Sequence, residues 1–281
     1  MKVLKYFLAI LAVMIMNVSN GQSAKPKKVL VLYYSQTSNT ELVAKEIAKR
    51  MNADIEEIEA VKPYDGDFMA TIERCQKERE QGVIPEIKPI KSKLKKYDLI
   101  FIGYPIWFGT YAPPIATFLK NTDLSEKQII AFCTFGSGGL ESSLTDLFKA
   151  QPNAQILGGY GVRAARLDAM PAEVDRFLKE NELIEGDYVK LAPFPMPQPV
   201  NEDEVDIFKA ATDDYPMMSA EAKKVAKREI PNGTEYFFIA VDKPRENRPN
   251  MPPAGEMQVF VTVIDGEAPV FTKVVRPTPE E

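Results

Sequence analysis

A run of hydroxyl and amide side chains, Ser35–Thr40, separates a strongly apolar segment from an amphipathic one. It lies in the stretch YYSQTSNTELVAKE, where no Lys or Arg appears before Lys45. Short hydrogen-bond donors ahead of a helix can hold an anion, because backbone N–H groups and the positive end of the helix dipole attract negative charge. The missing lysine argues against a nucleotide-hydrolysing P-loop, in which Lys reaches the terminal phosphates. The run is better suited to binding a single phosphate group without hydrolysing it.

The same run also fits a simple helix cap. Ser38 followed three residues later by Glu41 has the spacing of a capping box. A cap explains these two residues, but it leaves the other polar side chains of the run without a reason. From this segment alone both interpretations stay open.

Two further segments suit a planar ligand. GYPIWFGTYAPP, residues 103–114, contains Trp107, the only tryptophan of the chain. TFGSGGLESS, residues 134–143, contains three glycines that would let the backbone approach a ligand closely. The plainer interpretations are core packing for the aromatic side chains and a flexible turn for the glycines. The first segment supplies hydrogen-bond donors, the second an aromatic surface and the third a glycine-rich loop. Together they predict a site for a planar molecule with one phosphate, such as flavin mononucleotide (FMN).

The elements that must position these segments follow a regular alternation. Apolar runs typical of buried parallel strands cover residues 27–35, 97–106, 127–136 and 154–164, and residues 53–60 predict a more exposed strand. Stretches with helical spacing cover residues 41–51, 66–82, 113–121, 142–151 and 171–181. The alternation predicts an α/β fold with a doubly wound, five-stranded parallel sheet of order 2-1-3-4-5. Ligands bind such sheets beyond the carboxyl ends of the strands, where the three segments lie.

The character of the sequence changes after residue 185. Prolines at 193, 195, 197 and 199 predict an extended linker over residues 186–200. Residues 201–281 predict a small α+β domain, with helices in VDIFKAA and SAEAKKVAKREI and strands in TEYFFIAVD, MQVFVTVID and APVFTKVV. Asp265-Gly266, between the last two strands, is a strong hairpin signal. Nothing in this part of the sequence predicts its role.

The first 24 residues have the layout of a secretory signal peptide. Lys2 and Lys5 precede an apolar run from Phe7 to Met16, which is too short for a typical membrane-spanning helix. We therefore expect an exported chain, periplasmic or extracellular, whose first folded domain covers residues 25–185 and which keeps no stable membrane anchor after cleavage. The alternative is a chain anchored in the membrane by an uncleaved N-terminal segment.

The composition of the chain argues against several classes of function. The net charge of −5 and a pI near 5.2 argue against nucleic-acid binding, which usually needs a basic face. The chain has no histidine, so it has no Ser-His or Cys-His couple and no imidazole metal ligand. We predict no catalytic side chain and no metal site. Whether Cys75 and Cys133 pair stays open, because one pair of cysteines predicts nothing.

The chain resembles the flavodoxin family over residues 27–183, and in particular its short-chain, flavodoxin-like bacterial subgroup. The resemblance rests on YYSQTSNT, GYPIWFGTYAPP and FCTFGSGG, together with FMATIERCQKEREQGVIPEIKP. It implies noncovalent FMN binding, with contacts from three groups of residues: Ser35, Gln36, Thr37, Ser38, Asn39 and Thr40 for the phosphate; Pro105, Ile106, Trp107, Phe108 and Gly109 for one ring face; Thr134, Phe135, Gly136, Ser137 and Gly138 for the ring edge or other face.

Two positions depart from the family pattern. The family commonly has Gly where this chain has Ser38. Many flavodoxins stack a Tyr from the third of these segments on the outer flavin face, and here Phe135 is the only aromatic residue nearby. The second departure leaves the outer face open, for a substrate or for the C-terminal domain.

The resemblance implies three candidate functions. The first is electron transfer through bound FMN, with a redox partner protein. The alternative is an FMN-dependent oxidoreductase of the NAD(P)H:quinone type, which reduces a small acceptor. The third is an exported binding or structural protein whose flavin site no longer works.

Overall fold

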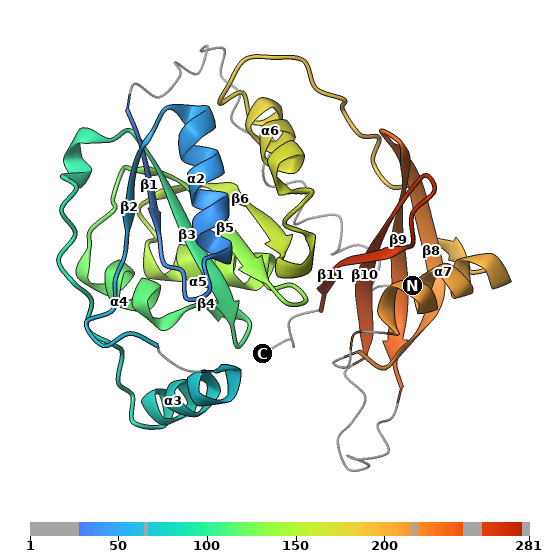
Figure 1. Ribbon diagram of the computed structural model, residues 1–281, viewed down its shortest axis with the longest axis horizontal. Coiled ribbons are helices and arrows are strands. Elements are labelled where there is room, and N and C mark those ends of the chain that lie inside the picture. Colours follow the sequence, from blue (N-terminus) through green and yellow to red (C-terminus); the bar gives the residue numbers. More distant parts are fainter. Residues whose placement is uncertain (1–27, 65–66, 214, 216–217, 244–254, 277–281) are drawn as a thin grey trace.

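The computed structural model describes residues 28–64, 67–213, 215, 218–243 and 255–276 of the 281-residue chain. Two units lie side by side, one built on a mainly parallel sheet and one on an antiparallel sheet (Figure 1). No helix in these ranges combines the length and the apolar character needed to cross a membrane. The predicted signal peptide, residues 1–24, lies outside the described residues.

Five parallel strands form the first sheet in the order β2-β1-β3-β5-β6. They are β1 (Val29–Tyr33), β2 (Asp54–Glu57), β3 (Leu99–Trp107), β5 (Gln128–Phe135) and β6 (Gln155–Arg163). A short strand, β4 (Thr110–Tyr111), pairs antiparallel with the end of β3. Counted along the chain, the parallel strands have the order 2-1-3-4-5. The predicted flavodoxin-like α/β fold is therefore confirmed.

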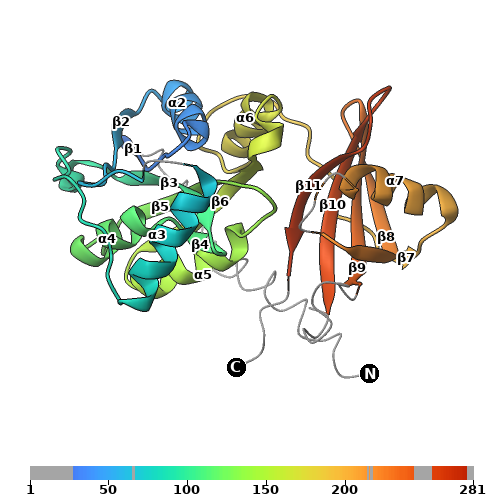
Figure 2. The same ribbon diagram turned by 60° about the horizontal axis from the view of Figure 1, so that its bottom comes forward.

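Helices cover both faces of this sheet, which is why β1, β3 and β5 are near-continuous apolar runs, whereas the edge strand β2 is polar and largely exposed. Along β1, Val31 faces the core that α2 and α6 close, whereas its neighbour Leu32 faces the core that α4 and α5 close. The helices are α2 (Asn39–Met51), α3 (Phe68–Glu80), α4 (Pro113–Asn121), α5 (Leu140–Ala150) and α6 (Met170–Glu180), with 3₁₀ turns at Leu94–Lys96 and Ala164–Arg166. Helix α3 lies beyond the carboxyl end of β3, beside β4 (Figure 2).

The second unit is an antiparallel sheet of order β11-β10-β9-β8-β7 with helix α7 on one face. Its elements are β7 (Gln198–Pro199), α7 (Glu202–Thr212), β8 (Ala220–Ile230), β9 (Gly233–Asp242), β10 (Glu256–Ile264) and β11 (Val270–Val275). Phe208 of α7 packs edge-on against Phe238 of β9, with ring centroids 5.2 Å apart. The β10–β11 hairpin turns at Asp265-Gly266, where Gly266 has a φ of 82°, so this hairpin prediction is confirmed.

The predicted helix in SAEAKKVAKREI is wrong, because residues 220–230 form strand β8. The Ala, Lys and Glu residues of this stretch favour a helix, but only by a few tenths of a kcal/mol each. Strand β8 pairs with β9 from Ala220 to Ile230 in one long hairpin, and its Val225 and Ala226 become buried. Pairing and burial over the whole strand outweigh the local preference.

Candidate functional site

The three segments singled out in the sequence meet at the carboxyl edge of the first sheet. Each segment contacts the other two, as three pairs of residues illustrate: Thr40 with Thr134, Tyr34 with Trp107, and Ile106 with Gly139. The topology explains this meeting, because β1, β3 and β5 are adjacent parallel strands and their carboxyl ends lie together. The elements around this edge can be followed in Figure 2.

The turn before α2 does not form the predicted capping box. Ser38 is the N-cap residue, but its side chain accepts no hydrogen bond from the helix. The reason is its backbone, which is left-handed with φ 61° and ψ −3°, whereas a capping Ser normally has extended dihedrals. Gly adopts this conformation without strain, whereas the Cβ of a Ser makes it costly. The N–H groups in the first turn of α2 therefore have no side-chain cap.

Buried hydroxyls at this turn have hydrogen-bonding capacity to spare. The Oγ of Ser35 is buried and has no hydrogen-bond partner among the described residues. The Oγ1 atoms of Thr40 and Thr134 lie 2.8 Å apart, with the two side chains 1% and 4% exposed. One hydrogen bond uses only one of their two O–H groups, and the described part of the chain offers the pair no further partner. Buried donors of this kind normally find an acceptor, so they are suited to a ligand oxygen.

The side-chain amide of Gln36, a predicted phosphate contact, is hydrogen-bonded within the chain. Its Nε2 donates to the backbone oxygen of Tyr64 at 3.0 Å and to Oγ1 of Thr71 at 2.7 Å. The side chain therefore ties the first segment to α3 instead of facing an anion. Thr37 is exposed on the loop, and Asn39 is the first, partly exposed residue of α2.

The second segment is a β-hairpin, not an irregular loop. Strand β3 continues through Pro105 and Ile106 to Trp107, and β4 returns beside it. Phe108 and Gly109 form the two-residue turn with φ values of 53° and 82°, the positive pair that a type I′ turn requires. Phe108 is 49% exposed at the tip, and the guanidinium of Arg79 lies 5.3 Å from its ring centre.

Trp107 is half-buried between two tyrosines that the sequence did not single out. Its ring lies edge-on to Tyr34 at 5.8 Å and to Tyr64 at 5.1 Å between centroids. Burial, with a hydrogen bond to Glu78, raises the pKa of Tyr64 well above its usual value, so this phenol stays neutral. Core packing is the correct interpretation for Tyr104, which is fully buried and bonded to Ser143.

The glycines of the third segment serve contacts within the chain. A Cβ on Gly138 would lie 2.1 Å from the backbone oxygen of Val274 in β11, and one on Gly139 would lie 2.6 Å from Cγ2 of Ile106. The close approach expected for a ligand is thus made by the chain itself at these two positions. Phe135 is 5% exposed and belongs to the core, so its ring does not lie over a ligand.

The cysteines and acidic groups add no second reactive centre. Cys75 and Cys133 are both free and buried. Burial raises the pKa of Cys75 to about 11 and that of Cys133 further, which keeps both thiols protonated at neutral pH. No group of His, Cys, Asp and Glu within the described ranges could hold a metal ion.

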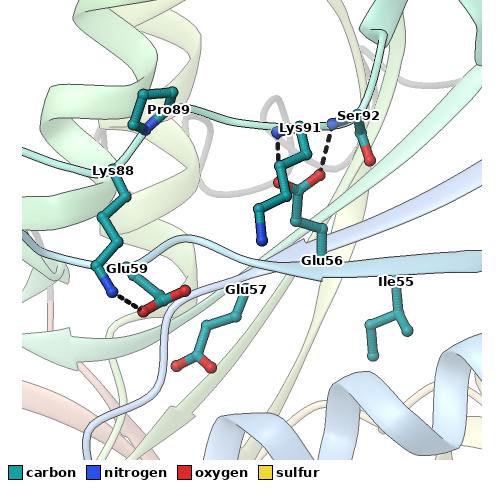
Figure 3. Close-up of a pocket in the computed structure, with 8 residues that line it drawn as sticks. All are labelled: Ile55, Glu56, Glu57, Glu59, Lys88, Pro89, Lys91 and Ser92. Carbon is teal, nitrogen blue, oxygen red and sulfur yellow. Dashed lines mark hydrogen bonds and ion pairs between the residues drawn. The ribbon is translucent and has the colours of Figure 1, made fainter.

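A surface hollow lies along β2 and contains none of the predicted site residues (Figure 3). Glu56 accepts hydrogen bonds there from the backbone N–H groups of Lys91 and Ser92, at 2.6 and 2.8 Å. Lys88 pairs with Glu59 across the same hollow. These contacts pin the segment before β3 to the edge of the sheet, so the hollow is a structural feature of that edge.

Comparison with known proteins agrees with the geometry. A family profile described as flavodoxin matches residues 28–169. The chain belongs to the flavodoxin family. The match covers the first unit up to the start of α6, and the antiparallel sheet lies outside it.

Individual proteins are similar to this chain over about half of its length. The uncharacterized protein MJ0298 of Methanocaldococcus jannaschii is 30% identical over 138 residues, which are 47% of this chain and 73% of that protein. A structure from Bacteroides eggerthii, provisionally described as a flavoprotein, is 30% identical with a TM-score of 0.45 and covers 53% of this chain and 96% of its own. A flavoprotein from Lactobacillus acidophilus in complex with FMN is 26% identical with a TM-score of 0.44, covering 53% and 97%.

Proposed function

We propose that this protein binds FMN noncovalently at the carboxyl edge of its first sheet and transfers electrons through it. One observation supports this most directly. Buried hydroxyls of Ser35, Thr40 and Thr134 have donor capacity to spare beside the uncapped first turn of α2. A phosphate monoester is an acceptor for such donors, and the helix dipole favours its charge. The flavodoxin family membership points to the same ligand.

The chain would hold the cofactor with its three joined segments. Ser35, the Thr40–Thr134 pair and the first turn of α2 would take the phosphate, and the hairpin carrying Trp107 would border the ring. The backbone of residues 136–138 would border the ring on the side of β5. When bound, the flavin supplies the redox chemistry, and the protein supplies its orientation and electrostatic surroundings.

Binding can be tested by titrating FMN into the full-length protein and following the emission of Trp107, which a nearby flavin quenches. We expect Ser35→Ala to weaken FMN binding at least about tenfold, the value of one hydrogen bond to a charged group. The same change should leave the stability of the FMN-free protein equal or higher, because it removes a buried hydroxyl without a partner.

Ser125→Ala is the matched control. Its hydroxyl bonds to Asp123 ahead of β5, at the opposite edge of the sheet, so FMN affinity should not change. Equal FMN affinity of Ser35→Ala and the unaltered protein would remove Ser35 from the site. Absence of binding by the unaltered protein would refute the proposed function.

A second candidate function is reduction of a small acceptor from NADH or NADPH. The observation that favours it is the burial of Phe135, because the third segment then has no aromatic ring to cover the outer face of a flavin. An uncovered face would admit a nicotinamide or a quinone. Stopped-flow mixing of the FMN-loaded protein with NADPH separates the two candidates. Reduction no faster than that of free FMN would leave the electron carrier, with a redox partner protein, as the function.

We also propose that the chain is exported to the periplasm or beyond, with residues 1–24 removed as a signal peptide. A chain that crosses the membrane unfolded must acquire FMN afterwards. Cell fractionation tests the proposal, and the intact chain in the cytosol would contradict it. Recovery of the intact chain with membranes would support the alternative, an uncleaved anchor.

A further inference from the structure

The second unit reaches the candidate site through the edge of its sheet. Strand β11 is the edge strand nearest to the first unit (Figures 1 and 2). The N–H of Val274 in β11 points away from β10 and donates to the backbone oxygen of Ser137 at 2.7 Å. Gly138 follows directly, and its lack of a Cβ lets the two backbones come this close. The edge of one sheet is thus hydrogen-bonded to the glycine turn of the other unit.

Arg163 holds the same junction from the end of β6. Its Nε donates to the backbone oxygen of Gly136 at 2.7 Å, and its Nη1 donates to that of Phe271 at 2.9 Å. The guanidinium also lies 4.6 Å from the ring centre of Phe271 and 5.3 Å from that of Tyr215. One planar group therefore bonds to the glycine turn and to β11 at once, which the single ammonium of a Lys cannot reproduce.

A third link is an ion pair, 2.8 Å long, between Lys273 of β11 and Glu141 in the first turn of α5. Both side chains are partly exposed, so the pair adds little to stability. The backbone hydrogen bond of Val274 and the two bonds of Arg163 are therefore the contacts that hold the turn.

These contacts reach the glycine turn from the side of β6, opposite to the side on which β3 lies. Arg163 ends β6, whereas Gly139 packs on Ile106 at the end of β3, and β5 lies between these two strands. The contacts with Thr40 and Ile106 thus approach the third segment from one side, and those with β11 approach it from the other. Strand β11 supports the turn without covering the side where Trp107 lies.

We propose that the second unit is a built-in support that holds the turn at residues 136–139 in the conformation that binds FMN, with Arg163 as the positioning residue and the Val274 N–H as the anchor. The inference rests on the proposed FMN site. It implies that FMN binding and docking of β11 strengthen each other, because coupling between two equilibria is reciprocal. It assigns a role to a unit that the flavodoxin match does not include.

Val274→Pro removes the anchoring N–H while keeping an apolar side chain. Proline is tolerated at an edge strand where the N–H lies outside the ladder. Val274→Ala is the matched control, since it shortens the side chain and keeps the N–H. One net hydrogen bond corresponds to a change of about twofold to tenfold in an equilibrium constant. We expect the Kd for FMN to rise by that factor in Val274→Pro relative to Val274→Ala.

Hydrogen exchange of the FMN-free, full-length protein provides an independent measurement. The amide proton of Ser143, which donates to the backbone oxygen of Gly139, should exchange faster in Val274→Pro than in Val274→Ala, because the turn opens more often. In the unaltered protein, saturating FMN should slow exchange of the Val274 amide. Arg163→Lys should reproduce the faster exchange if Val274→Pro does not fold. Arg228→Lys is its control, because Arg228 bonds to Glu235 of β9 and to Ala192 of the segment before β7, away from the glycine turn.

The outcomes separate this inference from the proposed function. If the unaltered protein does not bind FMN, the proposed function is wrong. Hydrogen exchange at the glycine turn then decides by itself whether β11 supports that turn. If Val274→Pro and Val274→Ala agree in FMN affinity and in exchange, and Arg163→Lys agrees with Arg228→Lys, the support role is wrong. Normal FMN binding with equal exchange rates would leave the flavin site intact and remove the second unit from it.

Discussion

The hydrogen bond between Thr40 and Thr134 joins the first and third segments and can be tested by replacing each residue with Val. Val has nearly the same shape as Thr, so packing is kept while the hydroxyl is lost. A single replacement leaves the other hydroxyl buried without a partner, because both side chains are at most 4% exposed. We expect each single variant to lower the free energy of unfolding by about 1–3 kcal/mol.

The double variant should behave differently. With both hydroxyls gone, two methyl groups face each other and no polar atom is stranded, so we expect a loss of less than about 1 kcal/mol. The two single changes would then be non-additive by about 1 kcal/mol or more. FMN affinity should not recover with stability, because the spare O–H that we assign to the phosphate is absent from the double variant.

The non-additivity can be measured by urea unfolding, followed by Trp107 emission, in the absence of FMN. The four proteins compared are the unaltered protein, the two single variants and the double variant. Unchanged m-values would show that the comparison concerns stability alone. Thr262 and Thr272 form a second Thr–Thr pair, with Oγ1 atoms 3.1 Å apart in the antiparallel sheet. The double Val variant of that pair should keep full FMN affinity.

Two results would refute the reasoning. Stability changes that add within about 0.5 kcal/mol would mean that Thr40 and Thr134 do not bond to each other. Unaltered FMN affinity in the Thr40→Val, Thr134→Val protein would mean that their spare O–H does not reach the phosphate. In the second case the first segment would hold the phosphate through Ser35 and backbone N–H groups.

Two further predictions concern the same region. Ser38→Gly should raise the free energy of unfolding by about 0.5–1 kcal/mol, because it removes left-handed strain of about 1–2 kcal/mol and adds about 0.5–1 kcal/mol of unfolded-chain entropy. Ser38→Ala keeps the Cβ and should show no such gain in urea unfolding; equal midpoints for the two variants would contradict the argument. Burial, then the charges of Glu57 and Glu41, raise the pKa of Tyr33 to about 12, so stability should fall as pH rises from about 10, where the unfolded phenol ionises, to about 12. Tyr33→Phe should lessen that fall, and an equally steep loss in both proteins would rule out this contribution.

Local patterns in the sequence were enough to determine the fold of the first unit. Apolar runs alternating with helix-period stretches identify strands and helices, because burial against a sheet or a helix imposes those periods on neighbouring residues. The right-handed crossover rule then leaves few strand orders, and the carboxyl edge follows from the parallel direction. For this reason the three segments around Thr37, Trp107 and Gly136 could be assigned to one edge before their contacts were known.

Only the tertiary structure decided what the side chains at that edge do. The sequence stretch around Ser38 matches a capping box, but the left-handed backbone at Ser38 prevents it. The amide side chain of Gln36 could bind an anion, yet it donates its hydrogen bonds to Tyr64 and Thr71. In the second unit, pairing with β9 turned a helix-favouring stretch into β8.

The role of β11 was also beyond the reach of sequence patterns. Arg163 and Phe271 are 108 residues apart, and no sequence motif around either residue predicts their contact. Periodicity records how a residue relates to its near neighbours, whereas a contact across that separation depends on how two complete sheets dock. The sequence by itself therefore determined the flavodoxin-like unit and the edge that carries its site. The tertiary structure decided which polar groups at that edge are hydrogen-bonded within the chain and which are left for a ligand. It also decided which strand supports them.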